Sequence, residues 1–284
     1  MKSFFNKFKI SIIFSLVVIL FSCVAIFLSK SKVQDTSEQN TLKVGMECAY
    51  APFNWIQPNE SNGAVKISGG WYACGYDVYM AKMIAKKMGK KLEIVKIDWD
   101  GLLPALTSGK IDAIIAGMSA TPERRRAIDF TNNYYTSNIV VVLKKTSPYA
   151  SARSLSDLEG ARITGQLSTV HYDLIDQIPG VKKKTAMEDF SSMISAVNAG
   201  KVDAYVSEKP AAMTAVCTNP SLTYIEFEQG QGFKFSQDDV AIAIGVRKGN
   251  KLKDEINEIL SSINEQTKTE LMTKAVENQP ASGN

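Results

Sequence analysis

Residues 103–116 read LPALTSGKIDAIIA, and residues 194–207 repeat their pattern as ISAVNAGKVDAYVS. In both segments a helical stretch ends at a glycine, Gly109 or Gly200, and a short apolar strand follows. Glycine adopts the left-handed conformation that a helix end needs. The copies begin at residues 103 and 194, too far apart for a solenoid repeat. They therefore suggest two lobes built on one plan.

The same alternation of apolar strands and amphipathic helices runs through most of the chain from Thr41 onward. This alternation is typical of an α/β fold with mostly parallel sheets. The predicted helices are centred on residues 81–88, 101–108, 171–178 and 193–197. The predicted strands are Leu42–Glu47, Leu92–Ile97, Ile111–Ile115, Ile139–Leu143, Arg162–Thr164, Val202–Val206 and Val240–Ile244.

Composition excludes several classes of protein. The chain has 284 residues, of which 45% are hydrophobic, so most of it is expected to fold around a sizeable core. Residues 1–40 hold five lysines and two acids, and the rest of the chain is almost neutral, so no nucleic-acid partner is expected. One histidine and four widely spaced cysteines argue against a multi-histidine zinc site and a disulfide scaffold. No metal or other cofactor is expected.

The N-terminus is typical of a targeting segment. Residues 1–9 are basic, residues 10–28 carry no charge, and a polar stretch follows to Asn40. Residues 1–28 are thus predicted to be a signal peptide or membrane anchor, and residues 29–40 a flexible tether. Within them LFSC at residues 20–23 resembles a bacterial lipobox, which predicts lipidation of Cys23. Phe21 is bulky for that motif and the apolar run continues to Leu28, so an uncleaved anchor stays open. Both readings place the remainder outside the cytoplasm, tethered to the outer face of the cell membrane.

Seven segments in order carry a family resemblance, which covers residues 41–275. They are VGMECAYAPF (44–53), GYDV (75–78), DWDGLLPAL (98–106), IAGMSATPER (115–124), DFT (129–131), SLSDLEG (154–160) and DAYVSE (203–208). Together they resemble the extracytoplasmic amino-acid-binding proteins of polar amino-acid ABC importers, which are bacterial solute-binding proteins of family 3.

This resemblance implies a fold, an activity and partners. The fold is a periplasmic-binding-protein-like type II clamshell, in which two hinge strands near residues 140–145 and 241–245 join the lobes. Lobe 1 would comprise residues 41–142 plus 243–284, and lobe 2 residues 143–242. The protein would be a monomer that captures a free amino acid and delivers it to the permease subunits of an ABC importer.

A free amino acid needs a partner for each of its charges, because an unpaired buried charge costs several kcal/mol. The two repeated strands end near Gly117 and Glu208, at the sheet edge where α/β proteins bind ligands. Arg124 follows the first strand and can bind a carboxylate through two hydrogen bonds. Glu208 can pair with the ammonium group. Alternatively, Arg124 is a solvated member of an arginine run, and Glu208 is a first-turn acid of a helix.

By resemblance, Ser119 adds its amide and hydroxyl to the carboxylate site, and Gly117 offers its carbonyl to the ammonium. The alternative for Ser119 is a helix cap. Thr169 would contact the carboxylate from the start of the helix at residues 171–178, and Gln166 lies on the same edge. The family usually has glycine before this threonine, whereas this chain has Ser168.

The side-chain pocket is expected to contain Tyr50 and Trp99, which resemble the aromatic pair that sandwiches the ligand side chain. Glu47 ends the first strand and can pair with a cationic tail between these rings, which favours arginine or lysine. Glutamine remains the alternative, since a carboxylate also accepts from an amide.

Catalysis is not expected, because an enzyme needs a positioned acid or base beyond the groups that bind the ligand. The candidates are Glu47 and His171, and His171 is predicted to be an exposed helix residue. An enzyme or sensory receptor on the same fold is the remaining alternative. Whether Cys48 and Cys74 form a disulfide or stay free thiols is left open.

Overall fold

The computed structural model describes residues 40–279. The predicted signal peptide or anchor, the lipidation site Cys23 and the tether up to residue 39 lie outside the described residues. Within residues 40–279, no helix combines the length and apolar character needed to cross a membrane. From Leu42 onward the contacts group into one unit, which contains both large sheets.

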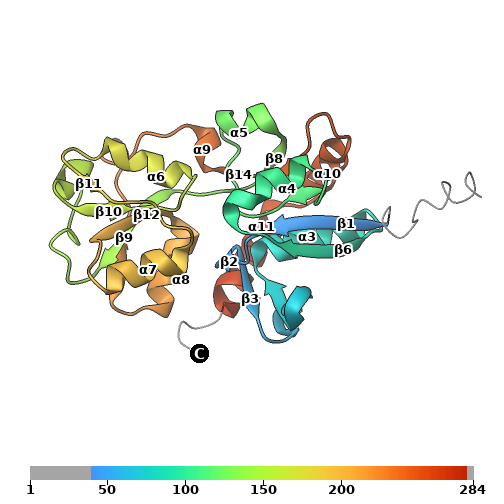
Figure 1. Cartoon of the computed structure of the whole chain (residues 1–284), viewed down its shortest axis with the longest axis horizontal. Helices are drawn as coiled ribbons and strands as arrows, with labels where there is room; N and C mark the ends of the chain where they lie inside the picture. Colours follow the sequence, from blue (N-terminus) through green and yellow to red (C-terminus); the bar gives the residue numbers. More distant parts are fainter. Residues whose placement is uncertain (1–39, 280–284) are drawn as a thin grey trace, which may run out of the picture. The chain divides into compact units, whose positions relative to one another are not determined.

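The first large sheet has five strands, which in spatial order are β6 (Lys91–Lys96), β1 (Thr41–Met46), β7 (Ala113–Ile114), β14 (Ala241–Val246) and β8 (Asp129–Thr136). β1 pairs with β7 in parallel, whereas β14 runs antiparallel to β7 and β8. The helices of this region are α3 (Tyr76–Lys87), α4 (Leu102–Thr107), α5 (Pro122–Ala127), α10 (Leu252–Ser261) and α11 (Glu265–Asn278) (Figure 1). α3 buries Ala81, Ile84 and Ala85 and leaves its lysines outward, so it packs beside β6 as an amphipathic helix.

The second large sheet also has five strands, in the order β11 (Lys182–Lys183), β10 (Arg162–Thr164), β12 (Ala204–Glu208), β9 (Ile139–Lys144) and β13 (Leu222–Ile225). β10 is parallel to β11 and β12, while β9 is antiparallel to β12 and β13. Its helices are α6 (Val170–Leu174), α7 (Phe190–Asn198), α8 (Lys209–Thr218) and α9 (Gln237–Val240).

Smaller elements complete the described chain. A four-stranded antiparallel sheet has the order β2 (Ala49–Tyr50), β3 (Asn54–Gln57), β5 (Tyr72–Cys74) and β4 (Val65–Lys66). The 3-10 turns are η1 (Ser61–Gly63), η2 (Ser68–Gly70), η3 (Trp99–Gly101), η4 (Leu155–Leu158) and η5 (Ile175–Gln177).

The repeated sequence pattern forms the expected structure twice. α4 ends before Gly109, and α7 ends before Gly200, with φ angles of 81° and 70° respectively. β7 and β12 follow, and each is the third strand of its sheet. The α/β class and the two similar halves are thus confirmed, and the carboxyl ends of β7 and β12 occupy equivalent places.

The sheets are mixed, although mostly parallel sheets were expected. The antiparallel strands are β9 and β14, which each enter from the other sheet. Only Ser137 and Asn138 separate β8 from β9, and α9 leads directly into β14. Parallel neighbours are joined by crossover connections within one sheet, and neither β9 nor β14 is reached by such a crossover, because each arrives from the other sheet.

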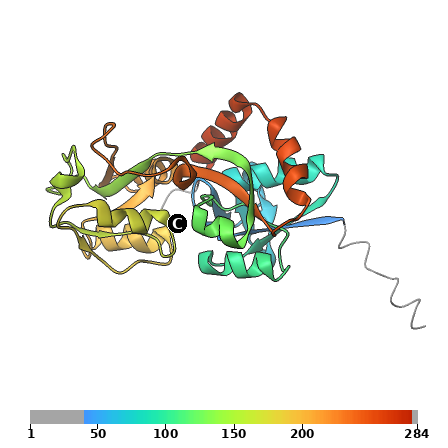
Figure 2. The ribbon, with the colours of Figure 1, turned by 90° about the horizontal axis from the view of Figure 1, so that it is seen from above.

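The chain passes between the large sheets at two adjacent segments (Figure 2). The Ser137 amide donates to the Val240 carbonyl at 3.1 Å, which links the two passages. All of β9 belongs to the second sheet, so the first passage lies at Ser137–Asn138, ahead of the residues 140–145 that the sequence suggested. The second passage precedes Ala241.

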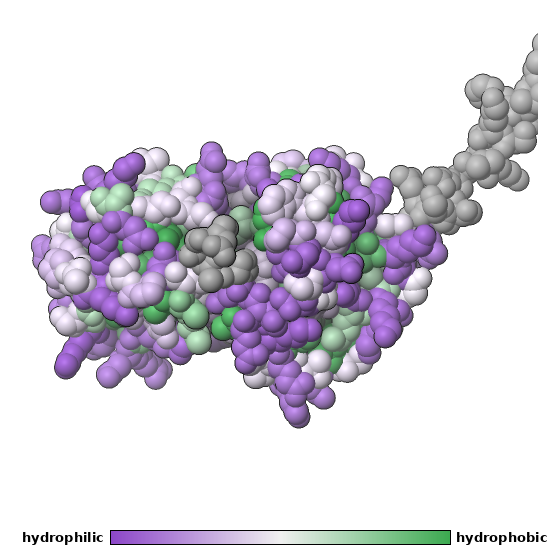
Figure 3. Space-filling model, turned by 90° about the horizontal axis from the view of Figure 1, so that it is seen from below, coloured by the Kyte–Doolittle hydropathy of each residue, from purple (hydrophilic) through white to green (hydrophobic). Residues whose placement is uncertain are grey.

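The face of the described chain that Figure 3 shows is mainly hydrophilic. The face in Figure 3 shows hydrophobic residues in small separate areas between charged and polar ones. Large hydrophobic side chains that are exposed within residues 40–279 are Trp71, Leu167, Met213 and Phe235.

Candidate functional site

Seven of the predicted ligand-binding residues line one small cavity of about 10 Å³. Their segments follow the carboxyl ends of strands in both large sheets, so residues distant in sequence meet there. The cavity is lined by Tyr50, Trp99, Gly117, Ser119, Arg124, Gln166 and Thr169, together with Val170 and His171.

Arg124 is half-buried in this cavity and makes two hydrogen bonds to neutral acceptors. Its Nη1 donates to the Ser119 carbonyl and its Nη2 to the Ser168 carbonyl, both at 2.9 Å. Its guanidinium also lies 5.0 Å from the centroid of the Trp99 ring. Burial lowers the pKa of Arg124 to about 10, and the group stays protonated at neutral pH. The site thus offers a positive charge with no salt-bridged carboxylate among the described residues.

The helix that carries Arg124 is capped by Thr121, whose side chain accepts from the Arg124 amide at 3.3 Å. Ser119 is therefore not the cap that the alternative interpretation required. It forms an isolated bridge with Ile242 of β14 and is 9% exposed.

Gly117 is held by a buried polar network. Its amide donates to Tyr134 Oη at 3.3 Å, and Tyr134 donates to Asp77 Oδ1 at 2.6 Å. Asp77 is fully buried and also accepts from Asn54 Nδ2 at 2.8 Å. Gly117 has a φ of 61°, and a Cβ there would lie 2.7 Å from the Tyr50 ring. Only glycine suits both this backbone conformation and this contact.

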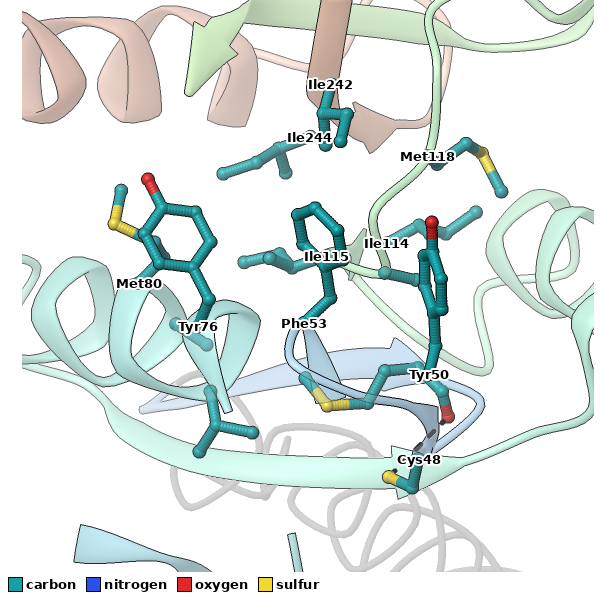
Figure 4. Close-up of a cluster of buried hydrophobic side chains, with 14 of the residues drawn as sticks. Cys48, Tyr50, Phe53, Tyr76, Met80, Ile114, Ile115, Met118, Ile242 and Ile244 are labelled. Carbon is teal, nitrogen blue, oxygen red and sulfur yellow. Dashed lines mark hydrogen bonds between the residues drawn. The ribbon is translucent and has the colours of Figure 1, made fainter. Parts of the chain in front are cut away.

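Tyr50 is stacked between two other aromatic rings. The Phe190 ring lies 4.4 Å away at 18°, and the Phe53 ring 5.0 Å away at 27°. Tyr50, Phe53 and Tyr76 lie in a row, with Ile114 and Ile115 beside these rings (Figure 4). Phe190 was not predicted as a site residue. It begins α7 directly after its capping residue Asp189, and no motif marks it as a partner of Tyr50.

Glu47 and Gln166 meet although they are far apart in sequence. Gln166 Nε2 donates to Glu47 Oε2 at 3.0 Å and also to the Glu188 carbonyl at 3.0 Å. Glu47 is 5% exposed, and its Oε1 has no hydrogen-bond partner within the described part of the chain. Burial raises the pKa of Glu47 to about 7, with further increases from Asp189 and Asp98, and the bond from Gln166 offsets part of this rise.

Ser168 stands where the resemblance leads us to expect glycine, and it adopts the backbone conformation that glycine favours. Its φ is 57°, in the left-handed region. Thr169 follows at the start of α6, and its Oγ1 donates to the Gln166 carbonyl at 2.7 Å. The Ser168 carbonyl faces Arg124 and Trp99, whose Nε1 donates to it at 3.3 Å.

His171 is buried, so the expectation of an exposed helix residue is wrong. It lines the small cavity, and its Nδ1 has no partner among residues 40–279. Burial, together with the charge of Arg124, lowers the pKa of His171 to about 4. The burial of His171 could have been predicted from its helical face, which it shares with Leu174 and Ile175, because those two residues are buried as well.

Glu208 ends β12 and is 4% exposed, but it does not line the small cavity. It stands at the cap position of α8 without a side-chain capping bond, so the helix-capping role lacks its usual contact. Burial raises the pKa of Glu208 well above its ordinary value, because no described cation compensates its charge.

Cys48 and Cys74 are both free and buried. Burial raises the pKa of the Cys48 thiol to about 12, so this thiol is not poised for nucleophilic chemistry. Across the described residues, no group of three or more His, Cys, Asp or Glu side chains is arranged to hold a metal ion.

Residues 42–277 match the family model of bacterial extracellular solute-binding proteins, family 3. The chain belongs to this family. The match spans both large sheets and every predicted binding residue. It confirms the recognition made from the sequence and the expected location outside the cytoplasm.

Individual relatives agree with this assignment. A protein of Campylobacter jejuni named "Probable histidine-binding protein" is 35% identical over 216 residues, which is 74% of this chain and 78% of the relative. The arginine-binding extracellular protein ArtP of Bacillus subtilis is 28% identical over 267 residues, covering 91% of this chain and 96% of its own. A crystal structure of an amino-acid ABC transporter substrate-binding protein from Streptococcus pneumoniae, bound to L-arginine, has a TM-score of 0.73 at 28% identity. That match covers 84% of this chain and 95% of the other. The two-lobed type II fold class is thereby confirmed.

Proposed function

We propose that this protein captures a free amino acid with a cationic side chain, arginine or lysine, and delivers it to the permease subunits of an ABC importer. The observation that carries the proposal is Glu47, a buried carboxylate that lines a cavity beside Trp99 and has one oxygen without a hydrogen-bond partner among the described residues. An unpaired carboxylate in a closed site is costly, and a guanidinium or ammonium group would compensate it. The arginine-binding relatives support the same ligand class.

In this proposal the ligand backbone is bound by charges from both halves. Arg124 binds the carboxylate, exchanging two neutral carbonyl acceptors for one charged partner, with Ser119 and Thr169 beside it. Glu208 binds the ammonium, with the Gly117 carbonyl as a second acceptor. The uncompensated burial of Glu208 supports this role, although its carboxylate does not line the small cavity.

The ligand side chain would extend toward Glu47 between aromatic surfaces. Trp99 and Tyr50 line the cavity, and Phe190 supports Tyr50 by stacking on its ring. Gln166 would give up its bond to Glu47 when a cation arrives. Glutamine is the second candidate ligand, because its amide can donate to the same carboxylate.

Entry of any amino acid requires movement, because about 10 Å³ holds no more than one water molecule. We expect the halves, residues 40–136 with 241–279 and residues 139–240, to separate about the passages at Ser137–Asn138 and Val240. Hinge closure of this kind needs few residues. Small-angle scattering should show a smaller radius of gyration with ligand than without it.

We further propose binding without chemical conversion, since neither Glu47 nor His171 has an acid–base partner in the site. Neither an enzyme nor a sensory receptor on this fold is favoured by a specific contact. We also propose a monomer, because the exposed hydrophobic side chains are scattered. Membrane attachment would come from lipidated Cys23 or from an uncleaved anchor within residues 1–28. Fatty-acid labelling that Cys23→Ser abolishes would support the lipid, and N-terminal mass mapping that retains Leu28 would support the anchor.

A thermal-shift screen of the twenty amino acids tests the ligand class. A ligand at 100 times its dissociation constant adds about 2.7 kcal/mol to the free energy of unfolding. Arginine or lysine should give the largest shift and glutamine the next. Glu47→Gln should remove the preference for cations over glutamine. A dominant shift from an acidic or aliphatic amino acid would refute the assignment of Glu47 to the side-chain pocket.

A further inference from the structure

A second cavity of about 380 Å³ adjoins the small one, since Trp99 lines both. Its walls hold five acidic residues and a single lysine, Lys96, so the charge is strongly negative. Its lining residues are Glu47, Ala49, Lys96, Asp98, Trp99, Asp100, Leu167, Glu188 and Asp189.

The acidic residues come from two separate parts of the fold. Asp98 and Asp100 flank Trp99 directly after β6 in the first sheet region. Glu188 and Asp189 directly precede α7 in the second. Carboxylates therefore face the cavity from both halves of the proposed clamshell.

Exposure changes from the mouth of this cavity to its inner wall. Asp98, Asp100 and Glu188 are exposed to solvent, whereas Glu47 is 5% exposed. Glu47 carries the unpaired Oε1, an independent sign that a cationic group is received at this end. Asp189 and Asp98 are near enough to act on Glu47 electrostatically, since the charge of each raises the pKa of Glu47 further.

We propose that this acidic cavity is the entrance for the cationic side chain, and that Asp98, Asp100 and Glu188 accelerate association without contacting the bound ligand. The inference rests on the proposed function, because it requires a cationic ligand. Exposed charges form weak ion pairs, so these residues would add little to the bound state. Carboxylates that line a cleft raise the local concentration of a cation and its association rate.

The test is stopped-flow binding of L-arginine to the purified protein at low and high ionic strength. The variant Asp98→Asn/Glu188→Gln removes two outer charges. Asp98 makes no side-chain capping bond, and Glu188 accepts from Gln166 through its main chain, so the changes spare the contacts of Glu47. The matched control is Glu93→Gln/Glu258→Gln, which removes two exposed charges outside the described cavities.

At low salt the association rate of the cavity variant should fall roughly three- to tenfold, while the dissociation rate and the control variant stay near the wild type. The difference should disappear at high salt, where the screening length falls to about 3 Å. An unchanged association rate at low salt would overturn the proposal, and so would a rise in the dissociation rate alone. Failure of the unaltered protein to bind either arginine or lysine would instead refute the ligand class in the proposed function, and this proposal with it.

Discussion

Replacing Arg124 by alanine should abolish most amino-acid binding while the protein stays folded. The guanidinium makes two hydrogen bonds, to the Ser119 and Ser168 carbonyls, and rests on the Trp99 ring. In the proposed complex it would meet the ligand carboxylate with the same pair of donors, and charge-assisted bidentate pairs are stronger than bonds to neutral acceptors.

The size of the effect follows from what alanine leaves behind. The ligand carboxylate would be enclosed beside the buried, unprotonated His171 without a cation. Truncating one partner of such a pair costs about 2–5 kcal/mol, which is roughly a 30-fold to several-thousand-fold rise in Kd. In the folded state the alanine variant loses two hydrogen bonds of a half-buried group. It also loses the unfavourable desolvation of the guanidinium, which lowers the pKa of Arg124, and this offsets part of the loss. We therefore expect the free energy of unfolding to drop by only about 1–2 kcal/mol.

Calorimetry against the amino acid with the largest thermal shift, together with denaturant unfolding, separates the two effects. Arg124→Lys keeps the positive charge but loses the planar guanidinium with its two parallel donors. Its Kd should therefore fall between those of the wild type and Arg124→Ala. Arg126→Ala is the matched control, since Arg126 is exposed on the same helix. A near-normal Kd for Arg124→Ala, or an equal loss in Arg126→Ala, would remove Arg124 from the carboxylate site.

Three further outcomes are expected. Glu208→Gln should weaken binding by about 2–5 kcal/mol in calorimetry without lowering stability at pH 8, because the buried carboxylate makes no capping bond and has no compensating cation among residues 40–279; a large loss of stability with normal binding would make it a structural residue. The pKa of Glu47, raised to about 7, predicts that the ionised form, and hence arginine affinity, increases as pH rises from 5.5 to 8, and that this rise vanishes in Glu47→Gln. In the free protein the sign is opposite, since ionising Glu47 makes the fold less stable as pH rises from 4.5 through 7; equal pH profiles of stability for wild type and Glu47→Gln would contradict this. Tyr134→Phe removes the hydroxyl between Gly117 and Asp77, so binding should weaken severalfold by calorimetry, whereas an unchanged Kd would show that Gly117 is positioned without it.

Most of the fold is readable from local pattern. The helix–glycine–strand repeat correctly placed α4, β7, α7 and β12, because glycine punctuation and apolar periodicity act within a dozen residues. The sequence pattern did not predict that β9 and β14 run antiparallel to their neighbours. A strand's sequence does not state its direction, which here depends on the short passages at Ser137–Asn138 and before Ala241.

In the candidate site too, residues that belong to local motifs were predicted, whereas residues placed by tertiary packing were not. Arg124, Ser119 and Thr169 were predicted because they stand in ordered motifs, and the structure places all three along one cavity. Phe190 was missed because stacking on Tyr50 depends on how the two halves meet, and no spacing rule connects residues 140 positions apart. His171 was predicted to be exposed, although it shares its helical face with the buried Leu174 and Ile175.

Three hydrogen bonds that join the two halves at the candidate site share one chemical feature. Arg124 and Trp99, from the first half, both donate to the neutral Ser168 carbonyl, and Glu47 accepts from the neutral amide of Gln166. Each of the two charged groups thus has a neutral partner in the place where a cationic amino acid would present a charged one. A ligand carboxylate at Arg124 and a ligand cation at Glu47 would replace weaker bonds by charge-assisted ones. The binding free energy is then the difference between the charge-assisted contacts to the ligand and the neutral contacts that they replace. The two halves can thus be in contact without a ligand and still be more stable when closed around one.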